Sequence, residues 1–130
     1  MSIIKNIQIL LVDNTAPIRN VVKMLLQELG YNNLLQADDS VNALDIIKNK
    51  KIDLIMSDWD AQYIVEKEFL ISLRKEERYK NLPIVIVSAE AKREQIMEAA
   101  EFDISGYLVM PLSGAVLQDK IVKIFKDRVG

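Results

Sequence analysis

Short apolar runs alternate along this chain with longer stretches in which apolar residues recur every three or four positions. The runs occupy residues 7–12, 33–36, 54–56, 84–87 and 107–109, the second being the weakest. Continuous apolar runs are typical of strands buried on both faces of a parallel sheet. The longer stretches have the spacing of amphipathic helices. Five strands alternating with five helices predict one doubly wound α/β domain, with right-handed crossovers and helices on both faces of the sheet.

Each predicted helix has an apolar face that we expect to turn inward. In chain order these faces are Ile18, Val22, Leu25 and Leu29; Val41, Leu44 and Ile47; Phe69, Leu70 and Leu73; Ile96, Ala99 and Ala100; and Leu117, Ile121 and Ile124. The fourth helix is expected to start near Ala91. Residues that favour helix N-termini precede three of the helices, namely Thr15, Asp39 or Ser40, and Ser113. Gly30 is expected to end the first helix.

Two runs of charged residues interrupt the apolar pattern, at residues 48–51 and 74–78. The first follows the second predicted helix, and we interpret it as a solvated helix end where cations complement the helix dipole. The second follows the third predicted helix. Because charged side chains are seldom fully buried, we expect it to be a solvated loop.

Size and composition indicate one domain that spans residues 1–130. Half of the residues are apolar and 28% are charged, an ordinary composition for a globular protein. No apolar run approaches the length of a membrane span, and the N-terminus has no signal-peptide pattern. We therefore expect no membrane insertion. The absence of cysteine excludes disulfides and fits a cytoplasmic protein.

Histidine is also absent, which excludes histidine acid–base catalysis, most zinc sites and a role as a phosphohistidine carrier. The formal net charge is −2, with both signs mixed along the chain. This charge gives no indication of nucleic-acid binding by the domain.

Residues that suit a reactive site or a sharp turn follow four of the predicted strands. They are Asp13-Asn14, Asp58, Ser88 and Met110-Pro111. Singly, each suits a capping or turn role. In a doubly wound sheet, however, the carboxyl ends of the strands meet at one edge, where ligands bind. Carboxylates and a hydroxyl gathered there suit a phosphoryl site, with a carboxylate as nucleophile, oxygens holding a divalent cation and the hydroxyl donating to a phosphoryl oxygen.

Four segments resemble the CheY-like receiver domain of two-component response regulators, and within that family the stand-alone chemotaxis regulators most. They are residues 9–13, Ser57-Asp58-Trp59, residues 83–92 and residues 105–109. The resemblance extends over nearly the whole chain. It implies a flavodoxin-like (βα)5 fold with a parallel sheet of strand order 2-1-3-4-5. It also implies a cytoplasmic signalling protein that receives phosphate from a histidine kinase.

The resemblance assigns the chemistry at the sheet edge to specific positions. Asp58 falls where the family is phosphorylated on aspartate. Asp13 matches the first member of the acidic pair that organises Mg²⁺, and Asp60 would offer its backbone carbonyl to the metal. We therefore expect Mg²⁺ as the cofactor.

Two further positions match the family's switch. Ser88 corresponds to the hydroxyl that follows the phosphoryl group. Tyr107 corresponds to the aromatic residue that couples the site to a target-binding face, made by the fourth helix, the fifth strand and the fifth helix. An alternative for Tyr107 is a half-buried amphipathic tyrosine with no switching role.

The sequence departs from the family pattern in three places. Asn14 replaces the second acid, so its side chain can offer Mg²⁺ an oxygen but no charge, and weaker metal binding is expected. Met110 replaces the family's lysine, and we expect it to pack as an apolar side chain. The loop at residues 60–66 lacks the family's Met-Pro and Asp-Gly, so it can follow a different path, where residues 63–65 could cover the pocket or a partner. Compared with the family pattern, the pocket therefore has one negative and one positive charge fewer.

Two functions from different classes remain. One is a receiver that accepts phosphate on Asp58 and switches a protein-binding surface. The other is a pseudo-receiver that binds a partner independently of phosphorylation, which Asn14 and Met110 favour. A nucleotide- or flavin-binding enzyme is disfavoured, because no glycine-rich loop follows the first predicted strand.

Overall fold

Strands and helices alternate along the chain in a computed structural model that describes residues 5–12, 16–59 and 64–126. The elements are β1 (Ile9–Val12), α2 (Ala16–Glu28), β2 (Leu34–Ala37), α3 (Ser40–Asn49), β3 (Leu54–Trp59), α4 (Ile64–Lys75), the short 3-10 helix η1 (Glu77–Tyr79), β4 (Ile84–Ser88), α5 (Arg93–Ala100), β5 (Gly106–Val109) and α6 (Gly114–Ile124). All five predicted strands are present, with ends that differ from the prediction by at most three residues.

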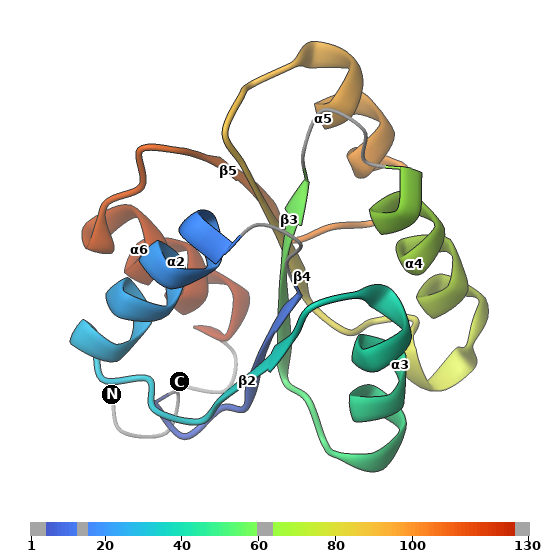
Figure 1. Ribbon diagram of the computed structural model, residues 1–130, viewed down its shortest axis with the longest axis horizontal. Helices are drawn as coiled ribbons and strands as arrows, with labels where there is room; N and C mark the ends of the chain where they lie inside the picture. The colour runs from blue at the N-terminus through green and yellow to red at the C-terminus, as the bar shows by residue number, and fades with distance from the viewer. Residues whose placement is uncertain (1–4, 13–15, 60–63, 127–130) are drawn as a thin grey trace.

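The strands form one parallel sheet of order β2-β1-β3-β4-β5, which confirms the predicted fold class and the strand order implied by the resemblance. β3 is the central strand and pairs with β1 on one side and β4 on the other. Because all strands are parallel, their carboxyl ends meet at the upper edge in Figure 1. None of the described helices is long and apolar enough to cross a membrane.

Two hydrophobic layers sandwich the sheet. Helices α2 and α6 cover one face, and α3, α4 and α5 lie on the other (Figure 1). Along β3, Leu54 and Met56 pack under α2 and α6, whereas Ile55 and Trp59 pack on the opposite side. Both faces of the strand are therefore buried, which explains its unbroken apolar run.

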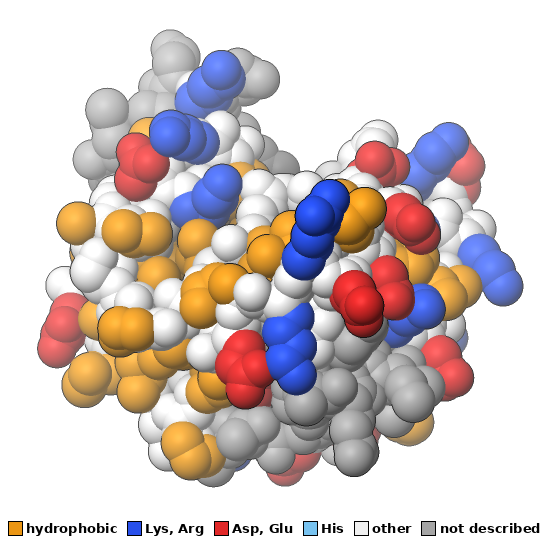
Figure 2. Space-filling model, turned by 90° about the horizontal axis from the view of Figure 1, so that it is seen from above, with side chains coloured by type: hydrophobic (Ala, Val, Ile, Leu, Met, Phe, Trp, Pro, Cys, Tyr) orange, Lys and Arg blue, Asp and Glu red, His pale blue; other side chains and the backbone are white. Residues whose placement is uncertain are grey.

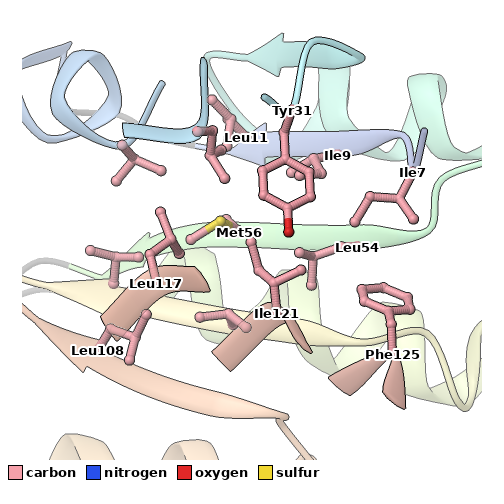
Figure 3. Close-up of a cluster of buried hydrophobic side chains, with 14 residues drawn as sticks. Ile7, Ile9, Leu11, Tyr31, Leu54, Met56, Leu108, Leu117, Ile121 and Phe125 are labelled. Carbon is pink, nitrogen blue, oxygen red and sulfur yellow. The ribbon is translucent and has the colours of Figure 1, made fainter. Parts of the chain in front are cut away.

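The layer under α2 and α6 ends at Tyr31, a fully buried residue that follows the first helix. Gly30, with φ of +97°, supplies the left-handed turn between the two. Figure 3 shows the Tyr31 ring among side chains of β1, β3 and α6. Its hydroxyl donates a hydrogen bond of 2.7 Å to Gln118 Oε1 on α6. This bond ties α6 to the segment that follows α2.

Two of the predicted helix caps are confirmed by hydrogen bonds. Asp39 accepts one of 2.8 Å from the backbone N–H of Asn42, and Ser113 accepts one of 3.2 Å from that of Val116. The third predicted cap, Thr15, lies outside the described residues. Residues 48–51 are exposed at and beyond the end of α3, as expected.

The prediction that Val41 lies on the inner face of α3 is wrong, because this side chain is 75% exposed. The Asp39 cap sets where the helix begins, and positions one and two turns later then face the sheet. These positions hold Ala43 and Ile47, which are buried, while Leu44 is half-buried beside them. The small residue Ala43 is therefore buried in the first half of α3, where the apolar pattern had predicted the larger Val41.

Helix α5 also differs from its prediction. It begins at Arg93 instead of near Ala91, and its buried residues are Gln95 and Ala99. Ile96 and Ala100 were expected inside but are exposed. The helix is rotated by about one position, because a polar side chain has found a hydrogen-bond partner in the interior.

The charge run at 74–78 is not simply a solvated loop. Helix α4 continues to Lys75, and Arg74 is half-buried. Its guanidinium donates hydrogen bonds of 2.8 Å to the backbone oxygens of Phe102 and Tyr79. Burial lowers the pKa of Arg74, although the nearby Asp103 opposes this. Arg74 therefore joins α4 to the loop before β5, and only the rest of the run is exposed.

We predict that Tyr31→Phe lowers the free energy of unfolding at pH 8 by about 0.5–1.5 kcal/mol, the usual loss for one hydrogen bond. Burial raises the pKa of Tyr31 above its ordinary value of 10.0, although the Gln118 hydrogen bond lowers it in part. The unfolded chain therefore ionises first as pH rises past 10, and the wild type loses stability there. Urea unfolding at pH 8 and pH 11 measures the free energy of unfolding of both proteins. The difference between the wild type and Tyr31→Phe should be smaller at pH 11 than at pH 8; an equal difference at both pH values would contradict the prediction.

Candidate functional site

Asp58 is buried at the carboxyl end of the central strand. Every residue of β3 is buried, and Asp58, the second-last, is only 5% exposed. Side chains alternate along a strand, so Asp58 belongs to the same side as Leu54 and Met56, under α2 and α6. A carboxylate in such a dry position has few water molecules to compete with a ligand for its oxygens.

A small cavity of about 10 Å³ adjoins Asp58 on the side of α2. Its volume corresponds to a single water molecule. Most of its wall is apolar and comes from β1, β3, β4 and α2, and the polar residues that line it are Asp58, Ser57 and Arg19. Asp58 therefore adjoins a cavity the size of one water molecule, lined in part by polar residues, within an otherwise hydrophobic layer.

Ser88 ends β4, one register step from Asp58. Asp58 pairs with Val87, and Trp59 pairs with Ser88. Ser88 is buried, and its hydroxyl donates a hydrogen bond of 2.9 Å to the backbone oxygen of Glu90 while accepting one of 3.3 Å from the Glu90 N–H. The hydroxyl thus lies at the edge where it was predicted, engaged with the loop that follows its own strand.

Met110 continues β5 at the same edge. Its backbone N–H donates a hydrogen bond of 2.9 Å to the Ser88 oxygen. Its side chain is half-buried and packs against the hydrophobic layer under α2 and α6, as expected for an apolar gap-filler. This position therefore offers no cation to the pocket.

Tyr107 on β5 is half-buried against the layer on the opposite side of the sheet. Its hydroxyl donates a hydrogen bond of 3.1 Å to Gln95 Oε1 of α5, and Gln95 is itself 3% exposed. Tyr107 thus has the amphipathic environment that we proposed as an alternative, and the same bond links β5 to α5. Gln95 lies one helical turn before Ala99, the only sequence signal that could have placed it inside.

Three of the predicted metal ligands, Asp13, Asn14 and Asp60, lie outside the described residues, so their positions stay predictions. Within residues 5–12, 16–59 and 64–126, no group of three acidic, histidine or cysteine side chains could hold a metal ion. Asp58 is the one predicted ligand that the structure describes.

Two polar residues near this edge were not predicted from the sequence to belong to the site. Arg19 lies on α2 and lines the cavity beside Asp58. Its only signal was its position next to Ile18, at the margin of the apolar stripe. Glu66 lies in the first turn of α4 and is buried. Nothing in the local sequence distinguishes it from Glu68, the exposed acid of the same helix.

The edge that carries these residues divides into two halves in Figure 2. Hydrophobic side chains gather over α2 and α6, whereas lysine, arginine and acidic side chains alternate over α3, α4 and α5.

Comparison with known proteins identifies the family. The response regulator receiver domain model matches residues 9–122. Chemotaxis protein CheY-3 of Vibrio cholerae is 42% identical over 122 residues, which cover 94% of both chains. Chemotaxis protein CheY of Pseudomonas aeruginosa is 40% identical over 119 residues, covering 92% of this chain and 96% of that protein.

Solved structures agree with this assignment. The chemotaxis protein CheY4 of Vibrio cholerae has a TM-score of 0.78 and 28% identity, and the match covers 91% of this chain and 98% of that one. The parallel sheet of order β2-β1-β3-β4-β5 agrees with these matches. The chain belongs to the response regulator receiver domain family of two-component signalling.

Proposed function

We propose that the protein accepts a phosphoryl group on Asp58, from a histidine kinase or a small phosphodonor, and thereby switches a protein-binding surface. The observation that carries this proposal is the buried carboxylate at the end of β3 with the Ser88 hydroxyl at the end of the neighbouring strand. A carboxylate nucleophile and a hydroxyl donor at one sheet edge suit phosphoryl transfer to the carboxylate.

In the transfer, a carboxylate oxygen of Asp58 attacks the phosphorus of the donor. The bond from phosphorus to the leaving group breaks, and its electron pair stays on that group. The leaving group is the imidazole nitrogen of a phosphohistidine, or acetate when acetyl phosphate is the donor. The product is an acyl phosphate on Asp58. Burial of Asp58 limits the water that could hydrolyse it.

Mg²⁺ is the cofactor that we propose, held by Asp58 together with Asp13, Asn14 and the backbone oxygen of Asp60. This donor set consists of oxygens only, which fits a hard divalent cation. When bound, the ion neutralises charge on the phosphoryl oxygens. Asn14 contributes no charge, so we propose that Mg²⁺ binds more weakly than it would to two adjacent acids.

Ser88 would respond to the new phosphoryl group. Its hydroxyl now donates to the neutral Glu90 carbonyl. A phosphoryl oxygen is a stronger acceptor, since hydrogen bonds to charged groups are about twice as strong as neutral ones. We propose that Ser88 exchanges the first acceptor for the second, which frees the loop between β4 and α5.

The surface that changes is formed by α5, β5 and α6, and a downstream protein would bind it. Within this surface, the bond from Tyr107 to Gln95 links β5 to α5. The relatives named above are chemotaxis proteins, so we propose a chemotaxis regulator that works in the cytoplasm. Its chemistry is confined to phosphoryl transfer to and from its own Asp58.

The second candidate is a phosphorylation-independent binding module. It is favoured by Met110, whose side chain packs into the apolar layer and leaves that position without a cation. Under this alternative, the α5–β5–α6 surface binds its partner without any modification of Asp58.

We predict that the protein gains one phosphate when it is incubated with acetyl phosphate and Mg²⁺, and that Asp58→Ala gains none. Intact mass spectrometry measures both. Transfer is expected to be slow, because Asn14 and Met110 remove two charges that assist it in the family. No gain at high donor and metal concentrations would support the binding-module alternative, as would partner binding that Asp58→Ala leaves unchanged.

We predict that Ser88→Ala slows the gain of phosphate about tenfold or more, since one hydrogen bond to a charged oxygen is lost. Ser88→Thr keeps the hydroxyl and should retain most of the rate. Ser72→Ala, at an exposed position of α4, is the matched control and should behave as the wild type. Equal rates for Ser88→Ala and the control would remove Ser88 from the mechanism.

We predict that Tyr107→Phe lowers the free energy of unfolding of the unmodified protein by about 0.5–1.5 kcal/mol, because the bond to Gln95 is lost. If Tyr107 leaves Gln95 on activation, the loss shrinks once beryllofluoride, a phosphoryl analogue, occupies Asp58. Urea unfolding with and without beryllofluoride and Mg²⁺ measures the difference. An equal loss in both states would assign Tyr107 a structural role only.

A further inference from the structure

A phosphoryl group on Asp58 carries negative charge into a mostly apolar layer, and that charge needs a cation beside it. Met110 cannot provide one, since its side chain is apolar and packs under α2 and α6. Another cation would have to come from the walls of the Asp58 cavity. Among the described residues that line it, Arg19 is the only one.

Arg19 approaches Asp58 from α2. It belongs to the second turn of this helix, which covers the sheet face to which the side chains of Leu54, Met56 and Asp58 belong. Its side chain is 19% exposed, so most of it lies inside the protein. The family's lysine would approach from the end of β5, whereas Arg19 approaches from α2.

The hydrogen bonds of Arg19 leave part of its guanidinium available. Nη1 forms an ion pair with Asp38, whose side chain is 79% exposed. Nε is buried and has no hydrogen-bond partner among the described residues. A buried N–H without an acceptor is unfavourable, and a negatively charged oxygen would satisfy it.

We propose that Arg19 binds the phosphoryl group on Asp58 and supplies the positive charge that the family's lysine, replaced here by Met110, would otherwise supply. This inference rests on the proposed phosphorylation of Asp58. Arginine suits the role because its planar guanidinium donates to phosphoryl oxygens in a fixed fork and stays protonated. The cavity of about 10 Å³ that both residues line has the size of one water molecule, about the space that one phosphoryl oxygen requires.

The ion pair with Asp38 does not prevent this role. Pairs with one solvent-exposed partner contribute little to stability, so Arg19 can turn from Asp38 to the phosphoryl group at small cost. Asp38 follows β2 and precedes α3, so it holds the guanidinium at the carboxyl edge of the sheet. We interpret the pair as the resting position of a side chain whose ligand arrives with phosphorylation.

The test is a titration of Arg19→Gln with beryllofluoride at fixed Mg²⁺, followed by the fluorescence of Trp59 beside the acceptor. The concentration of beryllofluoride for half-saturation should rise about tenfold or more relative to the wild type, as expected when a charge-assisted hydrogen bond is lost. Arg19→Lys should fall between the two. The gain of phosphate from acetyl phosphate, measured by intact mass, should fall in the same order.

Three variants separate a direct contact from a structural effect. Lys23→Gln removes a cation one turn further along α2, outside the cavity lining, and should change nothing. Asp38→Asn breaks the ion pair but keeps Arg19, so it should bind beryllofluoride as well as or better than the wild type. Met110→Lys added to Arg19→Gln should recover part of the lost affinity, which a purely structural role of Arg19 would not allow.

The outcomes distinguish this inference from the function on which it rests. A wild type that neither gains phosphate nor binds beryllofluoride would overturn the proposed function and this role with it. A wild type that does both, with Arg19→Gln unchanged, would overturn only the role of Arg19. Equal weakening in Arg19→Gln and Asp38→Asn would also overturn it, because the ion pair alone would then explain the effect.

Discussion

Burial of β3 on both of its faces is the constraint on which the rest of the structure depends. Its residues alternate between the layer under α2 and α6 and the layer under α3, α4 and α5, so the strand forms part of two separate cores. It is held between β1 and β4 by parallel pairing along its length. A strand fixed on four sides cannot shift its register without exposing a whole layer. The position of Asp58 at its end is therefore determined by the hydrophobic packing of the strand.

The sequence predicted the sheet well, because a continuous apolar run has few ways to be buried. It predicted the helix faces less well, and the failures have physical causes. Val41 is apolar but lies beyond the reach of the sheet once Asp39 has set the start of α3. Gln95 is polar but buried, because Tyr107 provides a partner that lies in a different strand. Arg74 satisfies backbone oxygens of residues that follow it by up to 29 positions. In each case a tertiary contact overrides the local pattern.

Some residues of the candidate site could likewise be placed from the sequence, and others could not. Asp58 and Ser88 could be placed from the sequence, since each follows an apolar run and parallel strands end at a common edge. The surroundings of Met110 followed from its chemistry. The proximity of Arg19 to Asp58 could not be predicted, because it depends on how α2 is rotated about its axis against the sheet. Arg19 lies at the edge of the apolar face of α2, and only the packing of this helix against the sheet brings it to the cavity beside Asp58 on β3.

Helix α5 has its polarity partly reversed: it buries Gln95 and Ala99 but exposes Ile96 and Met97. It has only eight residues, too few to be stable without tertiary contacts. The buried surface that anchors it is small, so detaching it from the sheet costs little compared with unfolding β3 or α6. Its amide protons should therefore exchange with solvent long before those of the central strand. The outward apolar pair means that a bound protein can contribute to the stability that the helix lacks by itself.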